Sequence, residues 1–166
     1  MVAPSRLKCP SEGSTPMFFR FDLETTARPE QVFHAFVDFS ASRLEVWKQT
    51  LDPKKYEVRE VGDGWAVAKE GSPGSWVLLR YEWSAPGTIH WSVIDTSYCR
   101  RGTGDITISP LDSGGSRVDA VLDHSGPKGL GGAVVLLMQR VIGPLLFPRL
   151  WKSALDRLAA TESPSG

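Results

Sequence analysis

Four polar side chains between residues 81 and 124 are of the types that acid and base chemistry needs: Tyr81, Asp95, Tyr98 and His124. General acid/base catalysis requires proton donors and acceptors within hydrogen-bond reach of one substrate. If Asp95 and His124 both point inward, they form such a pair for a carbonyl-rich substrate. The alternative, which we favour for Asp95, is that it caps the turn at residues 95–97, while His124 is a hydrogen-bonded residue at a strand end. No third residue at a defined spacing supports a nucleophilic triad.

Metal and cofactor sites are not expected. The three histidines are scattered, and the spacing of His34 and His90 within their own elements predicts that both point outward. Cys9 and Cys99 lie far apart and belong to no Cys/His cluster, which argues against structural zinc and a disulfide scaffold. The sequence therefore predicts no metal and no cofactor, and the cysteine usage favours a reducing cytoplasm.

Six tryptophans are the main compositional feature of the 166 residues. Large rigid rings with one polar N–H suit the wall of a pocket for a flat or apolar ligand, although plain core packing is the alternative. Trp76 has the wrong strand parity and is the exception. Together with neighbours of inward parity and the final helix, the predicted ligand-binding residues are Trp47, Tyr56, Trp65, Leu79, Tyr81, Trp83, Trp91, His124, Met138 and Trp151.

The elements that must position these residues follow from periodicity. Alternation predicts a strand over 17–25, and helical spacing predicts helices from Pro29 to about Asp38 and over 42–47. Turn signals between 53 and 127 then separate about six short alternating runs, which indicates consecutive antiparallel hairpins. In this reading Trp65 and Val67 share one apolar face with Tyr81. The segment Gly102-x-Gly104 fails the context of a phosphate loop and is read as strand bending.

The last segment, 129–160, is read as one long helix whose first part is apolar nearly all round. Pro144 and Pro148 should kink or interrupt it. Gln139 and Arg140 break the apolar run, and either anchor a ligand or form a solvated face. Burial against the sheet explains the apolar breadth most simply, with transient membrane docking as the other reading. Stable membrane insertion is not expected, because polar and helix-breaking residues interrupt the run.

Composition places the chain among ordinary globular domains. It has 19 basic and 19 acidic residues and 41% hydrophobic residues, so no long-range field favours nucleic acid. We expect a leader over 1–16, a single domain over 17–161 and a tail over 162–166, with translation starting at Met1 or Met17. Helices do not alternate with the later strands, so the fold class is α+β, in the order β-αα-β6-α.

This order, with the segments TTARPEQVFHAFVDFS, YEWSAPGTIHWSVIDTS and SPLDSGGSRVDAVLDHSG, resembles the START-like helix-grip (SRPBCC) superfamily. Within it, the chain is similar to the polyketide cyclase/dehydrase and lipid-transport branch. The resemblance implies a curved antiparallel sheet that grips a long C-terminal helix, with a cavity between them. It does not imply one reaction, because function lies in the site rather than in the fold.

The leading hypothesis is binding or transport of a small hydrophobic molecule, such as a lipid, an isoprenoid or a polyketide-like aromatic, in this cavity. The alternative is an aromatase or cyclase that folds a poly-β-ketone and moves protons with the four polar candidates. Convergence of those side chains would favour the enzyme, and a volume far below about 300 Å³ would exclude both. Whether the protein is an enzyme, and its oligomeric state, stay open.

Overall fold

Seven strands and three α-helices make up residues 18–162, the part of the chain that the computed structural model describes. The elements run in the order β1 (Phe18–Thr25), α1 (Pro29–Val37), α2 (Ser42–Val46), the 3-10 turn η1 (Pro53–Lys55), β2 (Glu57–Gly62), β3 (Trp65–Ser72), β4 (Ser75–Ser84), β5 (Thr88–Thr96), β6 (Cys99–Pro110), β7 (Ser116–Pro127) and α3 (Gly129–Glu162). The α+β order predicted from the sequence is confirmed. The expected leader and residues 163–166 of the expected tail lie outside the described residues.

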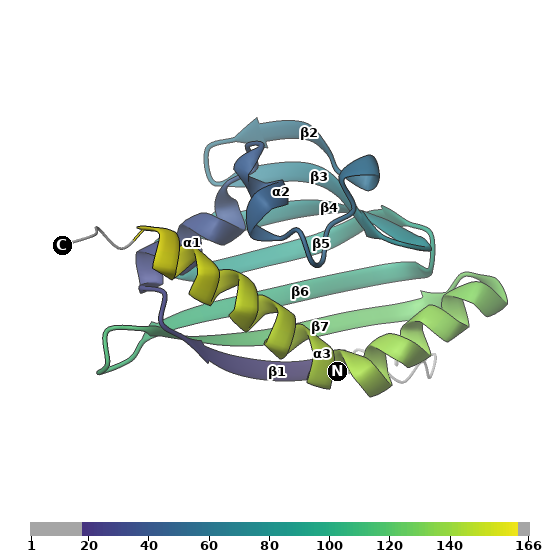
Figure 1. Cartoon of the computed structure of the whole chain (residues 1–166). Coiled ribbons are helices and arrows are strands. Elements are labelled where there is room, and N and C mark those ends of the chain that lie inside the picture. The colour runs from purple at the N-terminus through teal and green to yellow at the C-terminus, as the bar shows by residue number, and fades with distance from the viewer. Residues whose placement is uncertain (1–17, 163–166) are drawn as a thin grey trace, which may run out of the picture.

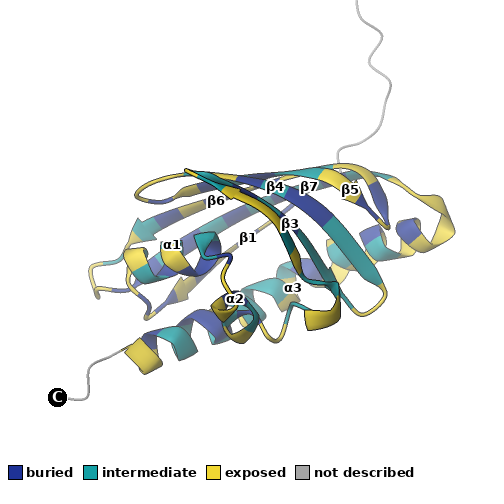
Figure 2. Cartoon of the chain, turned by 90° about the horizontal axis from the view of Figure 1, so that it is seen from above, coloured by how far each residue is buried: buried dark blue, intermediate teal, exposed yellow. Residues whose placement is uncertain are grey.

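All seven strands form one antiparallel sheet in the order β1-β7-β6-β5-β4-β3-β2. Strands β2 to β7 are consecutive hairpins, and β1 closes the other edge by pairing with β7, with Phe19 opposite Leu122 and Leu23 opposite Val118. Figure 1 shows the sheet curving beside α3, with α1 and α2 near one end. Figure 2 shows the sheet arched over that helix. The expected helix-grip arrangement is therefore confirmed.

The concave face of the sheet is apolar, as the strand alternation predicts. Ile89 and Trp91 in β5, Ile106 in β6 and Val118 in β7 are all buried in one cluster. His90 has the opposite parity and bonds through Nδ1 to exposed Asp105, 2.8 Å away, on the outer face. Inward apolar and outward polar residues thus alternate along these strands.

Strand β3 has the opposite parity to the prediction. Trp65 and Val67 lie opposite Glu82 and Arg80 on the outer face, where the Arg80 guanidinium lies 4.6 Å from the centre of the Trp65 ring. The inward residues are small: Ala66 and Ala68 are fully buried. Hydrophobicity alone favours an inward face with Trp65 and Val67, whereas the structure places two small residues inward, Ala66 beside Tyr81 and Ala68 beside Leu79 of β4.

Helix α3 continues through Pro144 and Pro148, and Figure 1 shows it bent near its middle rather than interrupted. Its C-terminal half is anchored in the core through Ala154, Leu155 and Ala159. Its N-terminal half contradicts the expectation that burial explains its apolar residues, because most of its large apolar side chains are exposed.

Asp156 joins the buried half of α3 to the end of β1. Its Oδ1 accepts hydrogen bonds from the Thr25 hydroxyl at 2.6 Å and the Thr26 backbone N–H at 3.0 Å, and its Oδ2 accepts one from Lys152 at 2.6 Å. Partial burial on its own would raise the pKa of Asp156, but the hydrogen bonds from Lys152, Thr25 and Thr26 lower it to about 2. The carboxylate therefore stabilises the fold only while it is ionised.

We predict that Asp156→Ala lowers the free energy of unfolding by about 1–2 kcal/mol at neutral pH, because it leaves the donors of β1 without their acceptor. The folded pKa lies below the unfolded value of about 4, so the difference from wild type is complete above pH 4 and shrinks as the pH falls toward 2. Urea unfolding at several pH values measures this difference. Glu60→Ala, which removes an exposed carboxylate from β2, should change stability little; an equal loss in both variants would contradict the role given to Asp156.

Candidate functional site

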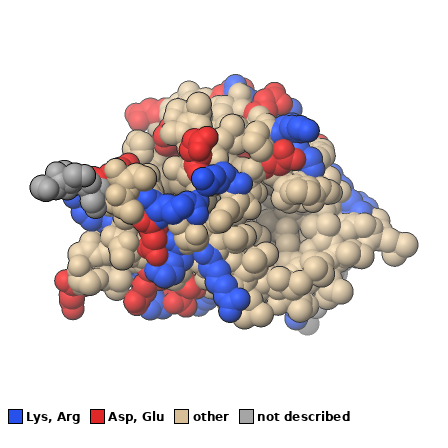
Figure 3. Space-filling view, in the orientation of Figure 1, with Lys and Arg blue, Asp and Glu red and all other residues tan. Residues whose placement is uncertain are grey.

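A cavity of about 380 Å³ lies between the concave face of the sheet, the middle of α3 and the segment that follows α2. Its size falls within the usual range for small-molecule sites, about 300–1,000 Å³. Figure 3 shows a hollow on the same side of the molecule, in a region where most residues are uncharged. The aromatic residues that line the cavity are Phe19, Phe36, Trp47, Trp76, Tyr81, Trp91, Tyr98, Phe147 and Trp151.

The aromatic wall is held by contacts among its own rings. Trp47 donates its indole N–H to the Ala35 carbonyl at 2.9 Å, and its ring meets Trp151 edge-on with centroids 5.8 Å apart. Phe36 packs against both tryptophans, at 4.8 and 5.1 Å. Because the Trp47 N–H is already satisfied within the protein, the Trp47 ring offers a ligand only apolar surface.

Two glycines of β6 make room for rings on the neighbouring strands. A Cβ atom on Gly104 would lie 2.0 Å from Cε2 of Trp91, and one on Gly102 would lie 2.4 Å from Cδ2 of His124. Any side chain at either position would push the ring into the cavity or away from the sheet. The glycines predicted to bend a strand thus also seat Trp91 and His124 against it.

One polar group of the cavity is the buried ion pair of Arg43 and Glu70. The side chain of Arg43 is 4% exposed, and its Nε and Nη2 lie 2.9 and 2.8 Å from Oε1 of Glu70. Its Nη1 donates to the Phe36 carbonyl at 2.9 Å. Burial on its own would lower the pKa of Arg43, but Glu70 more than offsets this and raises it. The guanidinium is therefore charged and occupied by protein acceptors.

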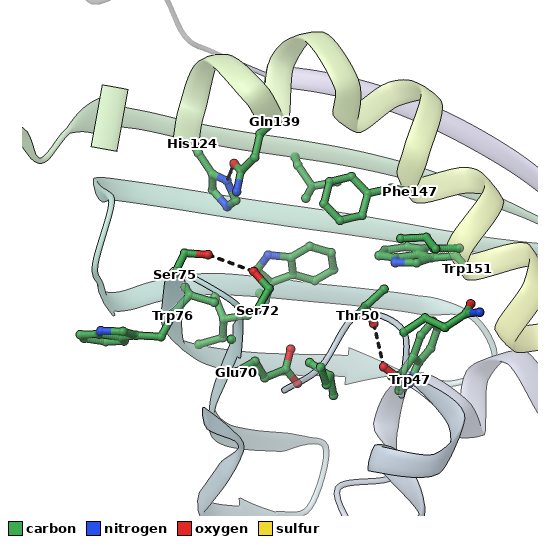
Figure 4. Close-up of a pocket in the computed structure, with 18 of the residues that line it drawn as sticks. Trp47, Thr50, Glu70, Ser72, Ser75, Trp76, His124, Gln139, Phe147 and Trp151 are labelled. Atoms are coloured by element: carbon green, nitrogen blue, oxygen red, sulfur yellow. Dashed lines mark hydrogen bonds between the residues drawn. The ribbon is translucent and has the colours of Figure 1, made fainter. Parts of the chain in front are cut away.

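Tyr81 completes this cluster by donating its hydroxyl to Oε2 of Glu70 at 2.8 Å. Burial and the Glu70 carboxylate both raise the pKa of Tyr81 well above its ordinary value. Tyr81 thus keeps its proton and is poorly suited to act as a base. Glu70 faces the cavity, as Figure 4 shows, and an ionised carboxylate has lone pairs beyond those used here, so it offers a ligand a hydrogen-bond acceptor.

A second polar cluster of the cavity joins β7 to α3. Nδ1 of His124 lies 2.9 Å from Oε1 of Gln139, so the imidazole donates through Nδ1 and leaves Nε2 as an acceptor. Burial lowers the pKa of His124 although the hydrogen bond to Gln139 opposes this shift, so the ring is neutral at neutral pH. Within residues 18–162, no residue hydrogen-bonds Nε2. Figure 4 shows His124 and Gln139 together beside the cavity.

Tyr98 packs edge-on against His124, with ring centroids 5.7 Å apart. Burial raises the pKa of Tyr98 to about 12, with hydrogen bonding by Gln139 partly offsetting the shift. A neutral imidazole acceptor and a phenol that keeps its proton therefore lie side by side. His124 and Glu70 belong to β7 and β3, which three other strands of the sheet separate.

The sequence-predicted residues divide into two groups. Those that line the cavity are Trp47, Leu79, Tyr81, Trp91, Tyr98, His124 and Trp151. Those that do not are Tyr56, Trp65, Trp83, Asp95 and Met138. Tyr56 donates its hydroxyl to the Phe39 carbonyl at 3.1 Å, and Trp83 stacks on the Phe39 ring at 5.9 Å. Met138 is 51% exposed, because its position on α3 turns it away from the sheet.

Asp95 does not reach His124. It is exposed near the end of β5, where it pairs with Lys128 at 2.9 Å and accepts the Thr96 N–H at 2.7 Å. Hydrogen bonding by Lys128 is the main cause that lowers the pKa of Asp95. The postulated pair of Asp95 and His124 is therefore absent, because the backbone bond fixes Asp95 near the end of β5, outside the cavity.

Sequence reasoning missed Arg43 and Glu70. Both are charged types that usually face solvent, so neither is marked by its identity. Strand parity could have identified Glu70. It follows Ala66 and Ala68 on the inward face of β3, and the opposite parity for that strand would have placed its side chain inside. Within residues 18–162, no three His, Cys, Asp or Glu side chains gather as a metal site would require.

Comparison with known proteins agrees with this architecture. The family described as polyketide cyclase / dehydrase and lipid transport matches residues 20–161. No curated protein sequence matches the chain.

Three solved structures illustrate the similarity in fold. The Zhui aromatase/cyclase from Streptomyces has a TM-score of 0.69 at 15% identity, covering 90% of this chain and 98% of that one. A START superfamily protein from Mycobacterium smegmatis has a TM-score of 0.64 at 15% identity, covering 87% and 97%. Norcoclaurine synthase from Thalictrum flavum has a TM-score of 0.65 at 10% identity, covering 90% and 97%.

At these identities the solved structures establish a shared fold and no shared activity. The family match covers most of the chain, from the middle of β1 to the end of α3, and so includes every element that lines the cavity. The fold is of a soluble type and is compatible with hydrophobic ligand binding. This chain belongs to the polyketide cyclase/dehydrase and lipid transport family.

Proposed function

We propose that the protein binds and carries a small, mostly apolar molecule in the cavity between the sheet and α3. The observation that carries the proposal is a pre-formed space of about 380 Å³ whose lining is largely aromatic and aliphatic. Burial of apolar ligand surface supplies the affinity, at about 25 cal/mol per Å² before the costs of association. Members of the START-like family bind small hydrophobic ligands, which supports the same function here.

Two polar clusters of the cavity offer hydrogen-bond acceptors to a ligand. Glu70 and Nε2 of His124 are both acceptors, while the charge of Arg43 is already neutralised by Glu70. A neutral ligand with a hydroxyl or N–H donor fits these acceptors. An anionic lipid headgroup does not, because it would meet the Glu70 carboxylate, and the cation among the described lining residues, Arg43, is already paired with it.

The direct test is native mass spectrometry of the protein purified from its own host. A co-purifying neutral apolar species supports the proposal and identifies the ligand class. Repeated absence of any bound species, together with no change of Trp fluorescence across a panel of lipids and polyketides, would overturn it.

We also propose that the protein acts in the cytoplasm. The buried free thiol of Cys99 supports this location, because thiols stay reduced there.

A second candidate function is ring closure in a poly-β-ketone, and the proximity of Tyr98 to His124 is the observation that favours it. Neutral His124 would take a proton from a carbon between two carbonyls, and Tyr98 would hydrogen-bond the carbonyl that the carbanion attacks. Asp95 takes no part, since it lies outside the cavity. Product analysis with a synthetic poly-β-ketone tests this: a cyclised product that His124→Phe no longer forms supports the enzyme.

We predict that filling the cavity blocks binding. Val77→Trp adds an indole to a lining position, so the affinity for the neutral probe N-phenyl-1-naphthylamine should fall by about tenfold or more. Val61→Trp makes the same change at a position on β2 that is 60% exposed, and should leave the affinity unchanged. Fluorescence titration gives both affinities, and thermal unfolding checks that both variants fold. Equal affinities in the two folded variants would place the ligand elsewhere.

We also predict a pH-dependent preference for ligands that carry an N–H hydrogen-bond donor. Carbazole has one N–H donor, and fluorene has the same shape without it, so only carbazole can bond to neutral His124. Because the pKa of His124 is lowered, the extra affinity for carbazole should be full at neutral pH and be lost as the pH falls well below about 6.5, where Nε2 gains a proton. His124→Phe should lose this pH-dependent part of the carbazole preference, as Trp fluorescence quenching would show, whereas any preference supplied by the Glu70 carboxylate would remain. The same loss of carbazole preference below about pH 6.5 in this variant would contradict the role of Nε2.

A further inference from the structure

The outward face of the N-terminal half of α3 is apolar. Its large exposed side chains, here called the apolar stripe, are Leu130, Val134, Leu137, Met138, Val141, Ile142 and Leu145, between 38% and 89% exposed. At about 100° per residue they fall within an arc of roughly 140°. Buried Gly132, Leu136 and Gly143 lie on the opposite side of the helix. The stripe therefore points directly away from the sheet.

An apolar surface of this kind marks an interaction site in soluble proteins. Helix α3 is long and apolar enough to cross a membrane by length and composition, but its C-terminal half is fixed in the core by Leu155. Near its start, a Cβ on Gly132 would come within 2.3 Å of the Tyr98 carbonyl, so this half is also packed on the sheet. Such a helix can lie along a surface without leaving the fold.

The charges closest to the stripe are mostly basic. Residues 124–155 contain four basic side chains and no Asp or Glu. Two of these cations are paired with acids outside this range, Lys128 with Asp95 and Lys152 with Asp156. Arg100 and Arg101 are exposed at the start of β6, which pairs with the last residues of β7 just before α3 begins. In Figure 3 the lower right of the molecule, where this half of α3 lies, is almost free of red. Apolar residues flanked by cations suit a membrane surface that carries anionic lipid.

The stripe also adjoins the cavity. Gln139, on the same half of α3, and Leu146, just beyond it, line the cavity, so a molecule leaving a bilayer beneath the stripe meets the cavity beside it. We propose that the apolar stripe docks on an anionic membrane surface, where the cavity exchanges its ligand; only the exchange rests on the proposed function.

The test is flotation of the full chain with vesicles of phosphatidylcholine plus phosphatidylserine. Val141→Glu places a charge in the stripe, and Val61→Glu makes the same change on β2; the two valines are 61% and 60% exposed. Wild type and Val61→Glu should float with the vesicles, whereas Val141→Glu should lose about tenfold in partitioning. Circular dichroism and binding of N-phenyl-1-naphthylamine in vesicle-free solution show whether each variant keeps its fold and its cavity.

Failure of wild type to bind these vesicles, or equal binding by the two folded variants, would overturn the docking proposal while leaving the cavity function intact. Light scattering tests whether the stripe instead binds a second copy of the chain. If wild type is a dimer and Val141→Glu is a monomer, the stripe is a dimer interface, and membrane docking is overturned. Normal flotation without any probe binding in solution would instead contradict the carrier function and not the docking surface.

Discussion

The buried charge of Arg43 is the constraint on which the cavity end of the fold depends. A guanidinium that is 4% exposed must find acceptors within the protein, because leaving such a charge unpaired costs about 3–5 kcal/mol. It takes one from the Phe36 carbonyl in α1 and the others from Glu70 in β3. Helix α2, in which Arg43 is the one buried residue, is thereby fixed against α1 and the sheet. The same carboxylate holds the hydroxyl of Tyr81, so one ion pair also orients a cavity wall.

A second constraint keeps the space open. The concave face combines large rings with residues that have almost no side chain, and the two are matched in position: Gly104 seats Trp91, and Gly102 seats His124. If each inward position carried a residue of middle size, the helix and sheet would close on each other at ordinary packing density. Most of the side-chain volume instead lies in aromatic rings, such as those of Trp47 and Trp151, that pack against one another in the cavity wall. A lined cavity follows from this uneven distribution of volume.

Sequence periodicity was sufficient for the architecture and insufficient for part of the site. Strand order, the long final helix and the inward parity of Trp91 and His124 follow from alternation and turn signals, which are local properties. The parity of β3 does not follow from these signals, because Trp65 and Val67 are more hydrophobic than the two alanines that alternate with them. The wrong parity for β3 placed Glu70 outside the predicted site. Asp95 lies outside the cavity because of the backbone near the end of β5, which strand alternation does not describe. Gln139 points inward because of how α3 is rotated about its axis relative to the sheet, and the sequence of α3 alone does not set that rotation.

The two halves of α3 explain how a buried site and an exposed apolar surface coexist on one helix. Leu155 and the Asp156 carboxylate secure the C-terminal half to the core and to β1. The N-terminal half is tied to the sheet by little more than the Gly132 and Leu136 packing and the Gln139 bond to His124. This second attachment is made by a residue that also lines the cavity. A ligand donor that engages Nε2 of His124 would therefore lie next to a hydrogen bond between the sheet and this half of the helix.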